Sequence, residues 1–177
     1  MFRSVLRLVL AAFLYSVPVA AQPQPDTEKQ DIEKQFIGTW RLIGAAQKLA
    51  DGTVRPSPAY GPNQLGYMIY TSDRHMCSVT VKADRPAWAS AGRPTDPELK
   101  SAWDGLGSYC ATWTVNAQEK SIVHHVEFDK SPNAAGSDRK RFYTFAGNRL
   151  ILRIDGGGGG GNVVENTVTW ERVAEPR

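Results

Sequence analysis

The chain of 177 residues is long enough for one domain with a real hydrophobic core, but not for several domains. Its 21 basic and 18 acidic residues give a formal net charge of +3. The basic residues are spread along the chain, which argues against a nucleic-acid or membrane-surface partner, because such partners need clustered lysines and arginines.

The first 21 residues have the three-part layout of a secretory signal peptide. Arg3 and Arg7 form a basic start, an apolar run follows over residues 8–19, and small residues end at Ala21. The run is shorter than the roughly 20 apolar residues of a transmembrane helix, and no cysteine stands at the cleavage point to carry a lipid. We therefore expect cleavage after Ala21 and export to the periplasm or out of the cell, with no membrane anchor afterwards. The remaining chain would hold 19 basic and 18 acidic residues.

Cys77 and Cys110 are the two cysteines of the chain. In an oxidising compartment such a pair favours a disulfide, which would stabilise the fold by about 3–4 kcal/mol. Both cysteines lie in predicted strands, so bridging depends on their facing and register, which sequence does not define. The alternative is two separate buried thiols.

After the signal peptide, a polar, proline-rich lead-in and a short helix are predicted over residues 22–35, with Asp26 or Thr27 as the N-cap. This helix could lie across one end of the domain. A second helix is predicted to start near Thr95 and to end near Gly105. Three prolines between residues 55 and 63 predict a loop without ladder pairing.

The rest of the chain reads as short strands separated by turns. Strands are predicted at residues 37–48, 64–71, 75–82, 108–115, 121–128, 139–145, 149–154 and 163–173. Roughly one turn signal per ten residues favours an all-β barrel or sandwich. About eight strands is typical of small closed barrels, and closure removes exposed sheet edges. The glycine run 156–161 lacks the Lys-Ser/Thr and helix of a phosphate loop, and predicts a hairpin tip.

Several short motifs occur in a characteristic order. They are Phe36-Ile37-Gly38-Thr39-Trp40-Arg41-Leu42, Gly66-Tyr67-Met68-Ile69-Tyr70, His124-His125-Val126 and Thr169-Trp170-Glu171-Arg172. In order and spacing they make the chain resemble the bacterial lipocalin-like domain family. The resemblance implies an eight-stranded up-and-down antiparallel barrel of the calycin type, here over residues 36–174. The family name reflects the fold, and a fold does not confer a function. The cysteine pair departs from the family pattern.

The resemblance also implies that Trp40 plugs one end of the barrel and that Arg172 packs over it. A guanidinium on an indole face contributes about 0.5–2 kcal/mol and seals that end against water. The alternative role for Trp40 is contact with a ligand. Since this end would be the closed one, a ligand is expected in the middle of the barrel or at the other end.

His124 and His125 are the most conspicuous polar pair. Adjacent residues of a strand face opposite sides of the sheet, so these two cannot chelate one ion together. His124 shares its parity with Ile122 and Val126 and is predicted to face inward. It can be a core histidine bonded to a neighbouring hydroxyl, or it can line a pocket. The sequence predicts no metal site and no cofactor.

Three aromatic residues, Tyr67, Tyr109 and Trp113, are candidate ligand contacts, with ordinary barrel core as the alternative for each. Arg139 and Arg141 share one parity. An inward arginine would anchor a carboxylate, whereas an outward one is merely solvated, and the outward reading is favoured.

No catalytic signature such as Gly-x-Ser-x-Gly or His-Glu-x-x-His occurs, so no catalytic residue is assigned. The leading hypothesis is an exported barrel that binds a small apolar molecule between its strands. The second is an isomerase or cyclase that uses the same cavity, with His124 as general acid or base. The third is a structural or interaction module with a solid core, marked by an exposed apolar patch around residues 86–88.

Overall fold

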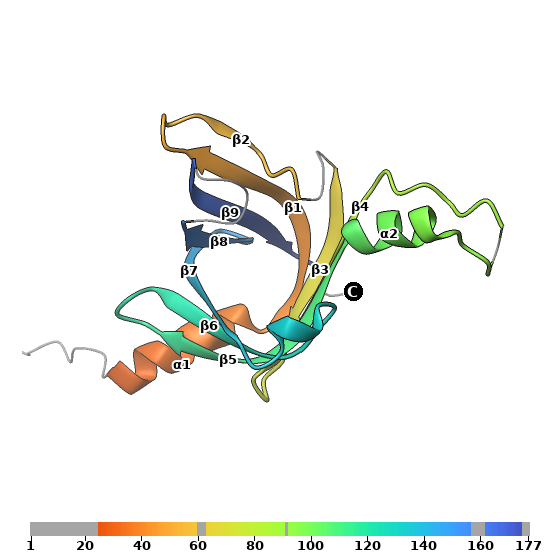
Figure 1. Cartoon of the computed structure of the whole chain (residues 1–177). Helices are drawn as coiled ribbons and strands as arrows, with labels where there is room; N and C mark the ends of the chain where they lie inside the picture. Colours follow the sequence, from red (N-terminus) through yellow and green to blue (C-terminus); the bar gives the residue numbers. More distant parts are fainter. Residues whose placement is uncertain (1–24, 60–62, 91, 157–161, 175–177) are drawn as a thin grey trace, which may run out of the picture.

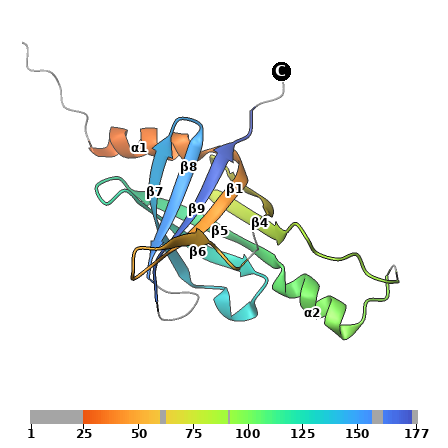
Figure 2. The same ribbon diagram turned by 90° about the horizontal axis from the view of Figure 1, so that it is seen from above.

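Eight antiparallel strands close into a barrel in the computed structural model (Figures 1 and 2). They are β1 (Gly38–Leu49), β3 (Gln64–Tyr70), β4 (His75–Lys82), β5 (Leu106–Asn116), β6 (Ser121–Asp129), β7 (Asp138–Ala146), β8 (Arg149–Asp155) and β9 (Val163–Arg172). Each strand pairs with the next, and β9 returns to β1 and completes the ring. The predicted up-and-down barrel is confirmed.

The structure describes residues 25–59, 63–90, 92–156 and 162–174. The expected signal peptide, the first residues of the lead-in and most of the glycine run lie outside the described residues. None of the described helices is both long and apolar enough to span a membrane.

A short extra strand, β2 (Val54–Pro56), pairs with residues 46–48 of β1. The prediction that the proline-rich segment has no ladder pairing was therefore wrong at its start. Proline lacks a backbone N–H, but it is tolerated on an edge strand, where only one side of the strand is paired. Pro56 ends such an edge strand.

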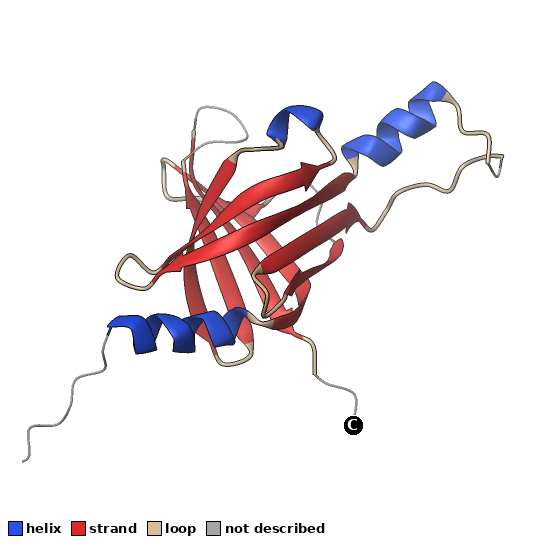
Figure 3. Cartoon of the chain, turned by 90° about the horizontal axis from the view of Figure 1, so that it is seen from below, coloured by secondary structure: helices blue, strands red, loops and turns tan. Residues whose placement is uncertain are grey.

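Helix α1 (Pro25–Phe36) lies across one end of the barrel and closes it (Figure 3). Its last residue, Phe36, is fully buried in the core. The Trp40 indole N–H donates a hydrogen bond to the Phe36 carbonyl at 2.8 Å. The Arg172 guanidinium lies 4.1 Å from the Trp40 ring centroid and donates to the Ile37 carbonyl at 2.7 Å. The tryptophan and arginine thus tie the two ends of the sheet to the helix that covers them.

Helix α2 (Asp96–Asp104) belongs to a long excursion between β4 and β5 and projects away from the barrel (Figures 1 and 2). Its start is defined by Glu98, whose carboxylate accepts a hydrogen bond from the Thr95 backbone N–H at 2.7 Å. None of its residues is buried. A short 3-10 helix, η1 (Pro132–Ala134), lies between β6 and β7.

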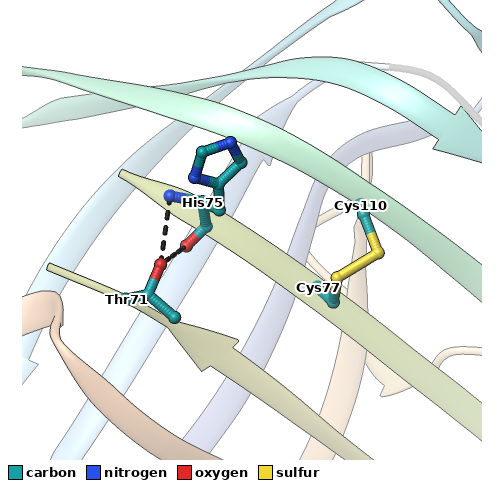
Figure 4. Close-up of a disulfide and its surroundings, with 4 residues drawn as sticks. All are labelled: Thr71, His75, Cys77 and Cys110. Carbon is teal, nitrogen blue, oxygen red and sulfur yellow. Dashed lines mark hydrogen bonds between the residues drawn. A yellow bond between two sulfur atoms is a disulfide. The ribbon is translucent and has the colours of Figure 1, made fainter. Parts of the chain in front are cut away.

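A disulfide joins Cys77 of β4 to Cys110 of β5, with an S–S distance of 2.09 Å (Figure 4). The two residues are direct partners in the β4–β5 ladder, and Cys77 is exposed on the outer face of the barrel. Of the two interpretations that the sequence left open, the structure has the bridge. Near the start of β4, the Thr71 hydroxyl donates to the His75 carbonyl at 2.8 Å and closes the β3–β4 turn (Figure 4).

Candidate functional site

The barrel interior consists of two halves. The half beneath α1 is filled by core side chains, whereas the opposite half encloses a cavity of about 430 Å³. Apolar side chains line part of it, among them Leu42, Met68, Leu152 and Trp170. The polar side chains that line it include Gln47, Ser78, Thr80, Tyr109, Asp129, Arg139, Arg141 and Asn166. This mixture of an apolar surface and a few convergent polar groups is typical of small-molecule sites.

Depth along the barrel decides which inward side chains reach the cavity. Tyr109 and Trp113 lie on the same inner face of β5, but four residues of a strand span roughly 13 Å. Tyr109 therefore lines the cavity, whereas Trp113 is buried in the closed half against Phe36 and Tyr70. Of these two candidate ligand contacts, only Tyr109 lies at the cavity.

His124 faces inward from β6 and is fully buried. The Tyr70 hydroxyl lies 2.7 Å from its Nε2, and the Tyr109 hydroxyl lies 2.8 Å from its Nδ1. Both ring nitrogens are thus occupied by tyrosines, so the ring is a core histidine satisfied by neighbouring hydroxyls. Through Tyr109 this hydrogen-bonded chain reaches the cavity wall.

Burial holds the pKa of His124 well below its ordinary value of 6.5, and the nearby charges of Arg141 and Arg139 lower it further. Burial also raises the pKa of the Tyr70 hydroxyl well above 10. The imidazole is therefore neutral in the folded protein. A neutral ring has one N–H donor and one acceptor, which matches two tyrosine hydroxyls that can each donate or accept.

The free energy of unfolding should fall as the pH is lowered below about 6.5. In that range a histidine of the unfolded chain takes up a proton, whereas His124 in the folded protein stays neutral. The unfolded state then binds more protons, so acid favours unfolding by about 1.4 kcal/mol per pH unit until the depressed folded pKa is reached. This stabilisation is fully present above 6.5. Urea unfolding at pH 7.5, 6.5, 5.5 and 5.0 measures it.

The variant His124→Gln should lose this part of the pH dependence, because the titrating group is gone. His75→Gln, a change at an exposed position of β4, is the matched control and should keep the native slope. Equal slopes for the native protein and His124→Gln between pH 5.0 and 6.5 would contradict the prediction.

Arg139 and Arg141 both line the cavity, so the interpretation that they face outward was wrong. The alternation of β7 turns them to the same side as buried Tyr143. Arg139 donates to the Asp129 carboxylate at 2.7 Å and lies 4.5 Å above the Tyr109 ring. Arg141 donates to the Lys140 carbonyl at 3.0 Å and also bonds with Tyr109. Burial lowers the pKa of the Arg141 guanidinium.

A sequence model of the lipocalin-like domain matches residues 37–173, which is most of the chain. The chain belongs to the lipocalin-like domain family. The same residues form the closed barrel and carry every polar group of the cavity described above. A comparison with curated proteins finds no match.

Tyr67 lies on the outer face of the lipocalin-like barrel and is 53% exposed. It is neither a cavity residue nor part of the core, contrary to both interpretations of its sequence position. The inward positions of β3 belong instead to its neighbour Met68 and to Tyr70, which are buried.

Two cavity residues of this lipocalin-like domain, Gln47 and Asn166, were missed at the sequence level. Gln47 is 2% exposed and donates from Nε2 to the Asn166 Oδ1 at 3.1 Å. The Arg55 guanidinium donates to the other amide atom, Oε1, at 3.1 Å. A bulge between Leu42 and Gly44 reverses the parity of β1, so the alternation that starts at Trp40 would place Gln47 outside. No signal in the sequence marks this bulge.

His125 points out of the lipocalin-like barrel, where its Nδ1 lies 2.7 Å from Asp138 and its Nε2 lies 3.0 Å from the Thr114 hydroxyl. The two adjacent histidines therefore serve different surfaces. Among the described residues, no three His, Cys, Asp or Glu side chains come together in a way that could hold a metal ion.

Proposed function

We propose that this lipocalin-like protein is an exported binding protein that holds one small molecule in the open half of its barrel. The observation that carries the proposal is the cavity of about 430 Å³, because ligand pockets have volumes of roughly 300–1,000 Å³. Leu42, Met68 and Trp170 offer an apolar surface for the body of the ligand. The cavity also argues against an interaction module with a solid core. Trp88, which belongs to the apolar patch expected for such a module, is exposed.

Two features support export to the periplasm or out of the cell. The layout of residues 1–21 is that of a secretory signal peptide with cleavage after Ala21. The Cys77–Cys110 disulfide is typical of an oxidising compartment. With 19 basic and 18 acidic residues after cleavage, the protein has no charge excess that would attract nucleic acid or a membrane surface.

A thermal-shift screen with small apolar and amphipathic metabolites, followed by native mass spectrometry, tests the binding function. A ligand that binds only the folded state raises the midpoint of unfolding, and the shift grows with the logarithm of the ligand concentration above the dissociation constant. We expect one ligand per chain. A screen in which no compound shifts the midpoint would contradict the proposal.

A pair of variants locates the binding. Ala45 lines the cavity, so Ala45→Phe should fill part of it and abolish the shift. Ile43→Phe adds a similar ring to the exposed side of the same strand and should preserve the shift. A shift that survives Ala45→Phe unchanged would place the binding outside the barrel.

An isomerase or cyclase is the second candidate, and the chain from His124 to Tyr109 favours it. The His124 ring is fully buried and does not line the cavity, so Tyr109 is the group that could pass a proton to or from a bound molecule. A bound compound recovered unchanged after long incubation supports the binding protein. A compound recovered as an isomer, and no longer converted by Tyr109→Phe, supports the enzyme.

A further inference from the structure

The charges that line the cavity do not balance. Lys130, Arg139 and Arg141 are the cations among the described lining residues, and Asp129 is the one acid among them. A cavity with such an excess of positive charge disfavours a purely apolar occupant, because a cation in its wall without a carboxylate partner would lose water and gain no partner.

Two of the three cations already have partners. Arg139 forms an ion pair with Asp129 at 2.7 Å, and that carboxylate is 7% exposed. The Lys130 ammonium donates to the Trp103 carbonyl at 2.7 Å and lies 5.0 Å from the Trp103 ring centroid. It is therefore turned toward the excursion that contains α2.

Arg141 is the remaining cation. Its hydrogen-bond partners are the Lys140 carbonyl and Tyr109, and it forms no ion pair with a carboxylate in the part of the chain that the structure describes. An arginine stays protonated in a protein, so its charge cannot be removed by losing a proton. Arg141 is half-buried, so its guanidinium is only partly hydrated, and an anion that enters the cavity would supply the missing counter-charge.

The position of Arg141 also sets the orientation of such an anion. Along β7, Arg139 is the cavity residue nearer the open end, and the next inward residue beyond Arg141 is Tyr143 of the filled half. Arg141 therefore lies on the inner side of the cavity. Its planar guanidinium has the geometry to hold the two oxygens of a carboxylate side by side.

We propose that the ligand of this barrel is an amphipathic carboxylate whose head group enters first and binds Arg141, with its apolar body against Leu42, Leu152 and Trp170. The inference rests on the proposed binding function and deepens it. A carboxylate brings one negative charge, which matches the single guanidinium that has no described carboxylate partner, whereas a phosphate monoester would bring close to two.

Matched pairs of probes test the charge of the head group. Decanoate and decanamide have nearly the same size and shape, as do 2-naphthoate and 2-naphthamide, but only the acids are charged at pH 7. Titration calorimetry in a chloride-free buffer should show that at least one carboxylate binds about 10- to 100-fold more tightly than its amide.

Variants test the assignment to Arg141. Arg141→Gln should reduce the carboxylate-to-amide ratio to within about threefold while leaving the affinity for the amide nearly unchanged, since only the charged contact is lost. Arg141→Lys keeps a charge but not the planar fork, and should give an intermediate ratio. Arg149→Gln removes an exposed arginine of the neighbouring strand β8 and should keep the native ratio. Circular dichroism checks that each variant is folded. If Arg141→Gln does not fold, the carboxylate-to-amide ratio of Arg141→Lys is compared with that of the native protein instead.

Each other result overturns the inference in a distinguishable way. Equal affinities for acid and amide would refute the carboxylate head group but leave a binding protein. A ratio that Arg141→Gln leaves unchanged would refute the assignment to this arginine. Displacement of decanoate by millimolar chloride or sulfate would identify a site for inorganic anions instead. If none of the four probes binds while another compound of the thermal-shift screen does, the carboxylate inference is refuted and the binding function stands. If no compound of the screen binds either, both are refuted.

Discussion

Phe36→Ala should lower the free energy of unfolding by about 3–5 kcal/mol, the range for removing a fully buried phenylalanine. The Phe36 ring is 0% exposed, and its centroid lies 4.9 to 5.9 Å from those of four aromatic side chains. These are Tyr70, Trp113, Tyr143 and Phe145. Removing the ring would leave a void at their centre and would remove the side chain that anchors the end of α1 in the core. Urea unfolding followed by tryptophan fluorescence measures the loss.

Phe128→Ala is the matched control. Phe128 lies on β6 and is 70% exposed, so its removal should change the free energy of unfolding by less than about 0.5 kcal/mol. A loss below about 1 kcal/mol for Phe36→Ala would show that α1 does not close the barrel. Phe36 lies in the filled half of the barrel, away from the cavity. The apparent ligand affinity of Phe36→Ala should therefore fall only in proportion to the fraction of the protein that is folded.

Removal of the disulfide by the double change Cys77→Ser and Cys110→Ser should lower the free energy of unfolding by about 3–4 kcal/mol. The bridge closes a loop with a sequence separation of 33 residues, and a loop of that length restricts the unfolded chain by about this amount. The folded barrel should persist, because the β4–β5 ladder extends to both sides of the bridge, from His75 to Val81 on β4. Urea unfolding of the oxidised native protein and of the double variant gives the difference.

Reduction supplies the control for that experiment. A phosphine reductant should destabilise the native protein to the level of the double variant and should leave the variant itself unchanged. A native protein insensitive to the reductant and equal in stability to the variant would show that the bridge does not form. Ser78, which follows Cys77, and Tyr109, which precedes Cys110, both line the cavity. Comparing the ligand affinity of the native protein with that of the double variant therefore shows whether the bridge also positions these two residues.

The sequence predicted a purely apolar ligand. The charge of the cavity wall instead supports the amphipathic acid proposed above. The prediction of an apolar ligand came from the aromatic residues expected inside the barrel, and part of the cavity lining is apolar. The structure adds two inward arginines on β7, of which one is paired with Asp129 and the other is not paired with a described carboxylate. If the proposed binding function is right, we expect these residues to select the head group of the ligand rather than its body.

The alternation of inward and outward side chains along single strands predicted much of the fold. It predicted the strands of the barrel, the inward face of β5 with Tyr109 and Trp113, and the inward position of His124, all of which the structure contains. These features follow from sequence because the period of two in a strand is a local property of the backbone. The meeting of Trp40 and Arg172 came from the order of the family motifs, which places the first and last strands side by side.

Depth, register and bulges were decided only by the tertiary structure. Whether Trp113 fills the closed half or lines the cavity depends on the stagger of the strands around the ring, which no single strand encodes. Disulfide formation depends on the register of β4 against β5 across the long excursion between them. The bulge in β1 turns Gln47 inward against the alternation of its own strand. The sequence therefore determined which side chains can face the interior, whereas packing around the closed ring decided which of them reach the cavity.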